Sequence, residues 1–197
     1  QFNDCWGVCS WASMDYYGNY KALQYRAKHF NAPVSVSIED KDGKVKLYIL
    51  NDKPKKQSLS LKCTIFDFEK GVLQEKTRDF EVDALANYEC FTLYEKQLAR
   101  HFELDRIGVK AELYKNGKLI NEKTYLFKPE KELQLTKPEM KLTTEVAGDE
   151  IAITVKSDRF ARLVRVESSL STLPLSDNYF DLLPGESKTV TMKIDPK

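Results

Sequence analysis

The chain has 197 residues, enough for one large domain or two small ones, and its 42% hydrophobic and 31% charged residues exclude a disordered or collagen-like protein. Its 31 Lys and Arg nearly cancel its 30 Asp and Glu, so no long-range field favours nucleic acid or anionic lipid as a partner. No apolar run approaches the roughly 20 residues that a membrane helix needs, so we expect no membrane partner.

The first 31 residues are rich in aromatic side chains. They hold eight of the 22 aromatics in the chain, a density that requires a large partner surface. Asn19 is a good helix N-cap, and apolar residues recur at helical spacing from Tyr20 to Phe30 until Pro33 ends the pattern. The segment predicts a strand or loop followed by one helix that lies against the next domain. The expected contact face of this helix consists of Leu23, Ala27 and Phe30.

From residue 34 the apolar pattern changes to a period of two, which is typical of β-strands. Asp42-Gly43 and Asn116-Gly117 predict tight hairpin turns, and one short helical turn is expected near residues 95–102. About seven short strands between such turns indicate an immunoglobulin-like sandwich. The expected strands are at residues 34–38, 45–49, 59–68, 72–82, 88–94, 107–114 and 119–127.

Residues 128–137 are mostly charged and lie next to Pro129 and Pro138, so they predict a linker. The strand pattern then resumes, with turns at Gly148-Asp149 and Pro184-Gly185. This part predicts a second, smaller sandwich, and the fold class is therefore mainly β, with two immunoglobulin-like domains. Its expected strands are at residues 141–146, 151–156, 163–167 and 189–194.

The four cysteines, Cys5, Cys9, Cys63 and Cys90, include no CxxC pair, and the two histidines are far apart in sequence. We therefore expect no metal site, and no sequence motif indicates a cofactor. Cys63 and Cys90 each lie in a strand-like run, which leaves two alternatives open: a disulfide between facing strands, or two free buried thiols.

No pair of carboxylates can be assigned to catalysis from the sequence. Catalysis by paired carboxylates needs two of them facing each other across the substrate, and most acidic residues after Pro33 lie in turns or alternate with lysines, as on a solvated sheet face. Asp4 and Asp15, in the aromatic segment, are better suited to buried hydrogen bonding than to proton transfer. We assign no catalytic residue to this chain.

The segment FNDCWGVCSWASMDYYGNYKALQY carries a specific resemblance. It resembles the end of the catalytic barrel in β-mannosidases and related family-two glycoside hydrolases, where an N-D-x-W-P-V core precedes S-W-x-x-x-D-Y-x-G and K-A-L. Gly7 stands where that pattern has proline, which loosens the turn after Trp6. The resemblance implies the eighth barrel strand, the loop above it and the eighth helix.

A second match lies near the C-terminus, where SDRFARLVRVE and SDNYFDLLPGESKTV resemble the small terminal immunoglobulin-like domain of β-mannosidases. With the first match, it predicts three parts. Residues 1–32 are the remnant of the last β/α unit of a TIM barrel, residues 33–130 a first sandwich, and residues 131–197 a second one.

The family's catalytic glutamates come from earlier barrel strands, so the resemblance implies a C-terminal fragment that is inactive alone. The segment after the eighth strand faces the sugar in such barrels. Trp6 is the first candidate for substrate binding, by stacking on a sugar ring, and Asn3 and Asp4 are further candidates. Packing between the barrel and the next domain remains an alternative for Trp6 and is the favoured interpretation for Trp11.

The most complete hypothesis is a fragment of a retaining glycoside hydrolase, by resemblance a β-mannosidase acting on terminal β-linked mannose. The sandwiches then support the barrel, and an oligosaccharide is the substrate of the whole enzyme. A free-standing carbohydrate-binding or structural sandwich module is the alternative. The resemblance favours an extracytoplasmic or lysosomal location.

Overall fold

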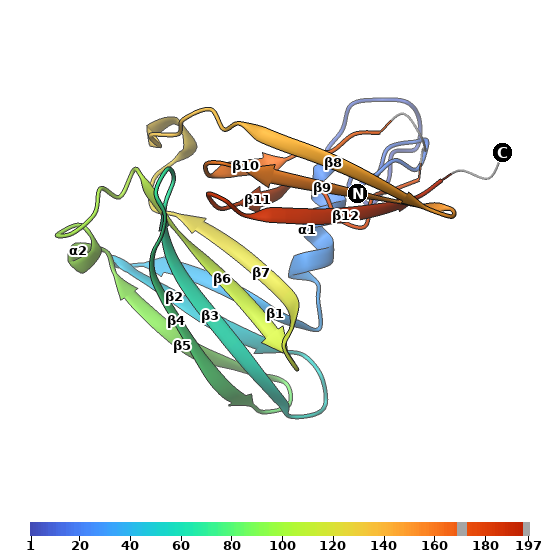
Figure 1. Cartoon of the computed structure of the whole chain (residues 1–197). Coiled ribbons are helices and arrows are strands. Elements are labelled where there is room, and N and C mark those ends of the chain that lie inside the picture. The colour runs from blue at the N-terminus through green and yellow to red at the C-terminus, as the bar shows by residue number, and fades with distance from the viewer. Residues whose placement is uncertain (169–172, 195–197) are drawn as a thin grey trace. The chain divides into compact units, whose positions relative to one another are not determined.

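The computed structural model describes residues 1–168 and 173–194 (Figure 1). The chain forms two compact units, one of residues His29–Thr136 and one that joins Gln1–Lys28 to Lys137–Lys197. β-Strands dominate both units, which confirms the predicted mainly β fold class. In the part of the chain that the structure describes, no helix is long and apolar enough to cross a membrane.

The N-terminal segment forms isolated bridges and then a helix. Asn3 pairs in parallel with Met14, and Met14 pairs antiparallel with Tyr20, before helix α1 (Ala22–Phe30) begins. The predicted order of strand or loop and then helix is confirmed. Asn19 is not the N-cap that its residue type predicts: the helix begins at Ala22, and the side-chain amide of Asn19 donates to Asp15 Oδ2 at 2.8 Å.

Helix α1 packs on the C-terminal sandwich of its own unit through Tyr25. The Tyr25 ring lies 6.0 Å from the Tyr179 ring, and Lys28 Nζ donates to the carbonyl oxygen of Ser176 at 2.9 Å. Leu23 and Phe30 are 46% and 61% exposed, so the predicted contact face is wrong. Sequence periodicity missed Tyr25 because a tyrosine is buried only where its hydroxyl finds hydrogen-bond partners, and periodicity does not reveal these. Here the partners are the backbone of Leu175 and the side chain of Asn178.

The first sandwich consists of two antiparallel sheets, as predicted (Figure 1). Strands β1, β2 and β5 form one sheet, and the other has the order β4-β3-β6-β7. The short helix α2 (Glu95–Leu98) connects the two sheets where a single helical turn was expected. The strands are β1 (Val34–Lys41), β2 (Lys44–Asn51), β3 (Gln57–Asp67), β4 (Gly71–Val82), β5 (Ala86–Tyr94), β6 (Ile107–Lys115) and β7 (Lys118–Leu126).

The two predicted hairpin turns have the backbone that their residue types favour. Asp42 and Gly43 have φ angles of 53° and 69°, and Asn116 and Gly117 have 51° and 74°. Two consecutive positive φ angles define a type I′ turn, in which Asp or Asn followed by Gly is preferred because both tolerate the left-handed region. Each turn therefore fixes the register of its hairpin.

The core of the first sandwich lies between its sheets and includes both buried cysteines. Val45, Leu47 and Ile49 alternate along β2 and are completely buried. Cys63 and Cys90 are free, which confirms the alternative of buried thiols. Burial raises the pKa of the Cys63 thiol to about 11 and that of Cys90 to about 12, so both stay protonated at neutral pH.

The second sandwich follows a short 3₁₀ turn, η1 (Glu130–Glu132), in the expected linker. It has a three-stranded sheet, β8 (Met140–Ala147), β9 (Glu150–Ser157) and β12 (Ser187–Lys193), and a two-stranded sheet, β10 (Ala161–Val164) and β11 (Phe180–Leu182). Their inner faces enclose a small apolar core. Its buried residues are Ile151, Ile153, Val155, Ala161, Val164, Val166, Phe180, Leu182, Val190 and Met192.

Strand β10 differs from the prediction, which placed it at residues 163–167. Leu163 has a φ of 52°, and beyond Val164 the side chain of Asn178 replaces a neighbouring strand. Its Oδ1 accepts from the backbone N–H of Val166 at 2.8 Å, and its Nδ2 donates to the Val166 carbonyl at 2.9 Å. Because one amide side chain satisfies both backbone groups, Val166 is buried without belonging to a strand.

Candidate functional site

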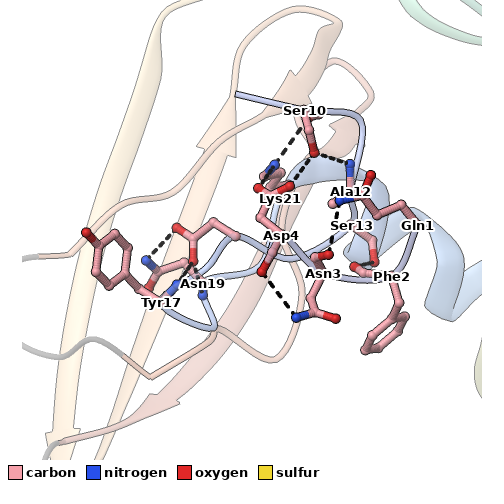
Figure 2. Close-up of polar contacts among 11 residues, drawn as sticks. Gln1, Phe2, Asn3, Asp4, Ser10, Ala12, Ser13, Tyr17, Asn19 and Lys21 are labelled. Atoms are coloured by element: carbon pink, nitrogen blue, oxygen red, sulfur yellow. Dashed lines mark hydrogen bonds and ion pairs between the residues drawn. The ribbon is translucent and has the colours of Figure 1, made fainter. Parts of the chain in front are cut away.

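The candidate site is the N-terminal loop that carries Trp6. Its two ends are Asp4 and Ser10, and Figure 2 shows their side chains bonded to each other, with the Ser10 hydroxyl donating to Asp4 Oδ1. Lys21 Nζ donates to Asp4 Oδ2 at 2.7 Å and to the carbonyl oxygen of Ser10 at 3.2 Å. These contacts close the chain into a loop, residues 5–9, called the Trp6 loop below.

The closed end of the loop is buried. Asp4 is 1% exposed, and the hydrogen bonds from Lys21, then from Ser10, hold the pKa of its carboxyl below its usual range. The carboxylate is therefore ionised at neutral pH and balanced by the Lys21 ammonium. An ionised carboxylate that already accepts from two side chains is suited to holding the chain and not to proton transfer.

Backbone hydrogen bonds also join the residues before the Trp6 loop to the residues after it (Figure 2). The carbonyl oxygen of Phe2 accepts from the backbone N–H groups of Ser13 and Met14, at 3.1 and 3.0 Å, and from the Ser13 hydroxyl at 2.8 Å. The Asp4 N–H donates to the Met14 carbonyl at 3.1 Å. Two strand-like pieces therefore run side by side beneath the Trp6 loop.

Asp15 stabilises the next turn in the same way. Its Oδ1 accepts from the backbone N–H groups of Tyr17 and Asn19, both at 2.8 Å, and the bond from the Asn19 side chain is the main cause that lowers the Asp15 pKa. The prediction that Asp4 and Asp15 serve hydrogen bonding agrees with these contacts. The sequence alone did not reveal Lys21 and Ser10 as partners of Asp4, because they lie 17 and 6 residues from it and no helix or strand periodicity brings them together.

The three predicted substrate-binding residues lie close together in sequence but have different surroundings. Trp6 is 66% exposed at the loop, with exposed Cys5 and Cys9 near it in sequence. Asn3 is exposed, and its Nδ2 donates to the Asp4 carbonyl at 3.3 Å. Asp4 is turned inward, so of the three, Trp6 offers most surface to a ligand.

Trp6 belongs to a broader exposed apolar surface on the N-terminal segment. Trp11 and Tyr17 are 82% and 79% exposed, although a soluble chain normally covers such large rings. This surface has the composition of a packing interface. Its exposed large residues are Phe2, Trp6, Val8, Trp11, Tyr16, Tyr17, Tyr20 and Leu23.

Two family models match the chain in succession. One, described as a mannosidase Ig/CBM-like domain, matches residues 43–132. The other, described as an Ig-fold domain, matches residues 135–197. Both sandwiches therefore have known counterparts.

Similar proteins cover the whole chain. β-Mannosidase B of Thermothelomyces thermophilus is 26% identical over 218 residues, which are 96% of this chain and 25% of that protein. A crystal structure of a β-D-mannosidase from Dictyoglomus thermophilum matches 100% of this chain and 24% of that one, with a TM-score of 0.85 and 22% identity. An exo-chitosanase structure from Amycolatopsis orientalis matches 96% of this chain and 27% of that one, with a TM-score of 0.69 and 20% identity.

The two structures share the fold of this chain, and at these identities they show the fold alone. Because one comes from a β-D-mannosidase and the other from an exo-chitosanase, this fold does not determine the sugar. The chain spans about a quarter of the length of the relatives that it matches.

Proposed function

We propose, from the premise that this chain belongs to the β-mannosidase-like glycoside hydrolases and carries their two immunoglobulin-type domains, that it completes a retaining enzyme for terminal β-linked mannose. In this proposal the sandwiches are accessory domains that support a catalytic barrel. Residues 1–32 are the last β/α unit of that barrel, and residues 33–130 and 131–197 are the sandwiches. The acid/base and nucleophile carboxylates belong to barrel strands outside this chain.

The observation that carries the proposal is the closed Trp6 loop. Its ends are fixed by Asp4, Ser10 and Lys21, while its indole stays 66% exposed. A loop with fixed ends that exposes an aromatic side chain suits stacking on the apolar face of a sugar ring. Trp6 is therefore the proposed wall of the sugar subsite. Asn3 is the proposed second contact, and Asp4 acts by holding the loop.

The exposed apolar surface supports the proposed contact with the barrel. Its rings lie on the segment whose sequence resembles a barrel strand and helix, and covering them requires a partner with a large apolar surface. Mannose as the sugar rests on the names of the relatives. In the active site, an oligosaccharide substrate then contacts this chain at the edge of the barrel, through the Trp6 loop.

The proposal predicts that the purified 197-residue chain hydrolyses an aryl β-mannoside no faster than buffer. Without a pair of catalytic carboxylates, acid/base and nucleophilic assistance are both lost. A chromogenic assay measures this rate, and the parent enzyme assayed in parallel is the positive control. Turnover by a sample of the chain that is free of contaminating hydrolase would contradict the proposal.

A further inference from the structure

The outer face of the four-stranded sheet in the first sandwich carries a row of polar side chains. Ser60 of β3 lies directly opposite Asp79 of β4 on one side and Tyr114 of β6 on the other. Directly opposed residues of an antiparallel sheet project to the same face. Since the neighbouring residues Leu61 and Leu113 are completely buried in the core, this row projects outward.

Tyr114 is held in a fixed orientation on this face. Its hydroxyl donates to Glu112 Oε1 at 3.1 Å, and Glu112 Oε2 pairs with Lys62 Nζ at 2.6 Å. Burial and the adjacent Glu112 carboxylate raise the pKa of the Tyr114 phenol, so it remains a neutral donor. A half-buried ring anchored at its polar end loses little conformational freedom when a ligand contacts it.

The row borders a groove of about 530 Å³, within the range of about 300 to 1,000 Å³ typical of small-molecule sites. The β6–β7 turn, at Asn116 and Gly117, contributes to its lining. Several lining side chains have hydrogen-bonding groups that make no side-chain bond to any residue in the described part of the chain: Ser58, Ser60, Thr77, Asp79 and Asn116. Hydroxyl, amide and carboxylate groups therefore converge with one aromatic ring.

The charges of the groove define the ligand class. Lys62 is paired with Glu112, and Glu81 lies 3.7 Å from Lys56, which leaves Asp79 as the carboxylate of the groove without an ionic partner in the described part of the chain. A carboxylate disfavours phosphates and acidic sugars but accepts hydrogen bonds from neutral hydroxyl groups. The Tyr114 ring offers a surface for the C–H face of a sugar.

We infer that this groove binds a short neutral oligosaccharide, at a site separate from the Trp6 loop and without catalysis. The site keeps the accessory part of the enzyme on its polymeric or branched substrate. The inference goes beyond the proposed function: the role on the substrate and the choice of a mannose-based probe rest on that function, and the binding itself does not.

The test is a titration of the isotope-labelled 197-residue chain with β-linked mannotriose, followed by amide NMR shifts. We expect saturable shifts in residues of β3, β4 and the β6–β7 turn. Tyr114→Ala should weaken binding by about tenfold through the lost ring contact, and Asp79→Ala by several-fold. Because Asp79 is exposed, its variant should fold even if Tyr114→Ala is destabilised.

Tyr48→Ala is the matched control. Tyr48 lies on the other sheet of the same sandwich, bonds to Glu39 at 3.1 Å and should leave the affinity unchanged. Cellotriose and a trisaccharide of glucuronic acid serve as further probes, and the acidic trisaccharide should not bind. Absence of saturable shifts with both neutral trisaccharides, shifts confined to the Trp6 loop, or equal affinity of Asp79→Ala and the unmodified chain would each overturn the inference. Since no activity is measured, these results are independent of the assay for the proposed function.

Discussion

At the scale of single residues, Asp4 shows how a short-range motif serves a structural purpose. The sequence offered Asn3, Asp4 and Trp6 as one group, yet the structure buries Asp4 against Lys21 and Ser10 and exposes Trp6. A buried carboxylate must be paired with donors or a cation, or it loses its charge. The pairing therefore explains why an acidic residue lies beneath an aromatic loop.

Asp4→Asn should loosen the Trp6 loop. Hydrogen bonds from Lys21 and Ser10 lower the pKa of Asp4 in the folded state. The ionised carboxylate therefore stabilises the folded state at pH values above its unfolded pKa of about 3.9. This stabilisation is lost as the pH falls through the lower pKa of the folded state. Amide hydrogen exchange of residues 5–14 should be several-fold faster in the variant at pH 7. The difference should shrink as the pH falls below about 4.

Asp15→Asn is the control for this measurement, because Asp15 bonds to groups of its own turn and not to the Trp6 loop. It should leave exchange in residues 5–9 unchanged. If Asp4→Asn and the unmodified chain exchange at the same rate throughout residues 5–14, the closure of the loop does not depend on this ion pair.

At the scale of elements, strand β6 contains one glycine whose lack of a side chain is required by its neighbours. Gly108 lies opposite Phe66 of β3, and a Cβ atom there would lie 2.6 Å from Phe66 Cζ and 2.9 Å from Leu126 Cδ2. Phe66 is completely buried and cannot move away without disturbing its surroundings. Sterics, and not a positive φ angle, therefore select glycine at this position.

Gly108→Ala should destabilise the chain by about 1 to 3 kcal/mol through overpacking, measured by urea unfolding. Gly7→Ala is the matched control, since its Cβ would meet only the Tyr17 hydroxyl at 3.8 Å, an ordinary contact. That variant should be neutral or slightly more stable, by up to about 1 kcal/mol. A Gly108→Ala chain as stable as the unmodified one would show that Phe66 relaxes freely.

Elements determined by local chemistry could be predicted from the sequence. The turns at Asp42-Gly43 and Asn116-Gly117 followed from residue type alone, because the left-handed backbone selects those residues. Tyr25 as the buried residue of α1 could not be predicted, since its partners are more than a hundred residues away in sequence. Two other contacts were also missed, because no strand or helix periodicity links the partners: Asn178 bonds Val166 across 12 residues of chain, and Lys21 bonds Asp4 across 17.

At the scale of the whole molecule, the chain combines two well-packed sandwiches with an N-terminal segment whose large rings remain exposed. It spans about a quarter of its relatives' length, and each sandwich matches a family model. We propose that the exposed segment completes a sugar site on a barrel. Stacking on sugar and packing between domains then give Trp6 different measurable roles.

The most direct test measures kcat/KM and Tm of Trp6→Ala in the parent enzyme, with Trp11→Ala as the control. If the indole contacts the sugar, kcat/KM should fall by roughly one to two orders of magnitude, a loss of about 1.4 to 3 kcal/mol, while Tm changes little. Trp11→Ala should leave kcat/KM per folded molecule unchanged. The contradicting result is a Trp6→Ala enzyme with normal kcat/KM per folded molecule and a large fall in Tm. Trp6 would then only pack the barrel, and its truncation would leave a cavity that costs about 3 to 5 kcal/mol.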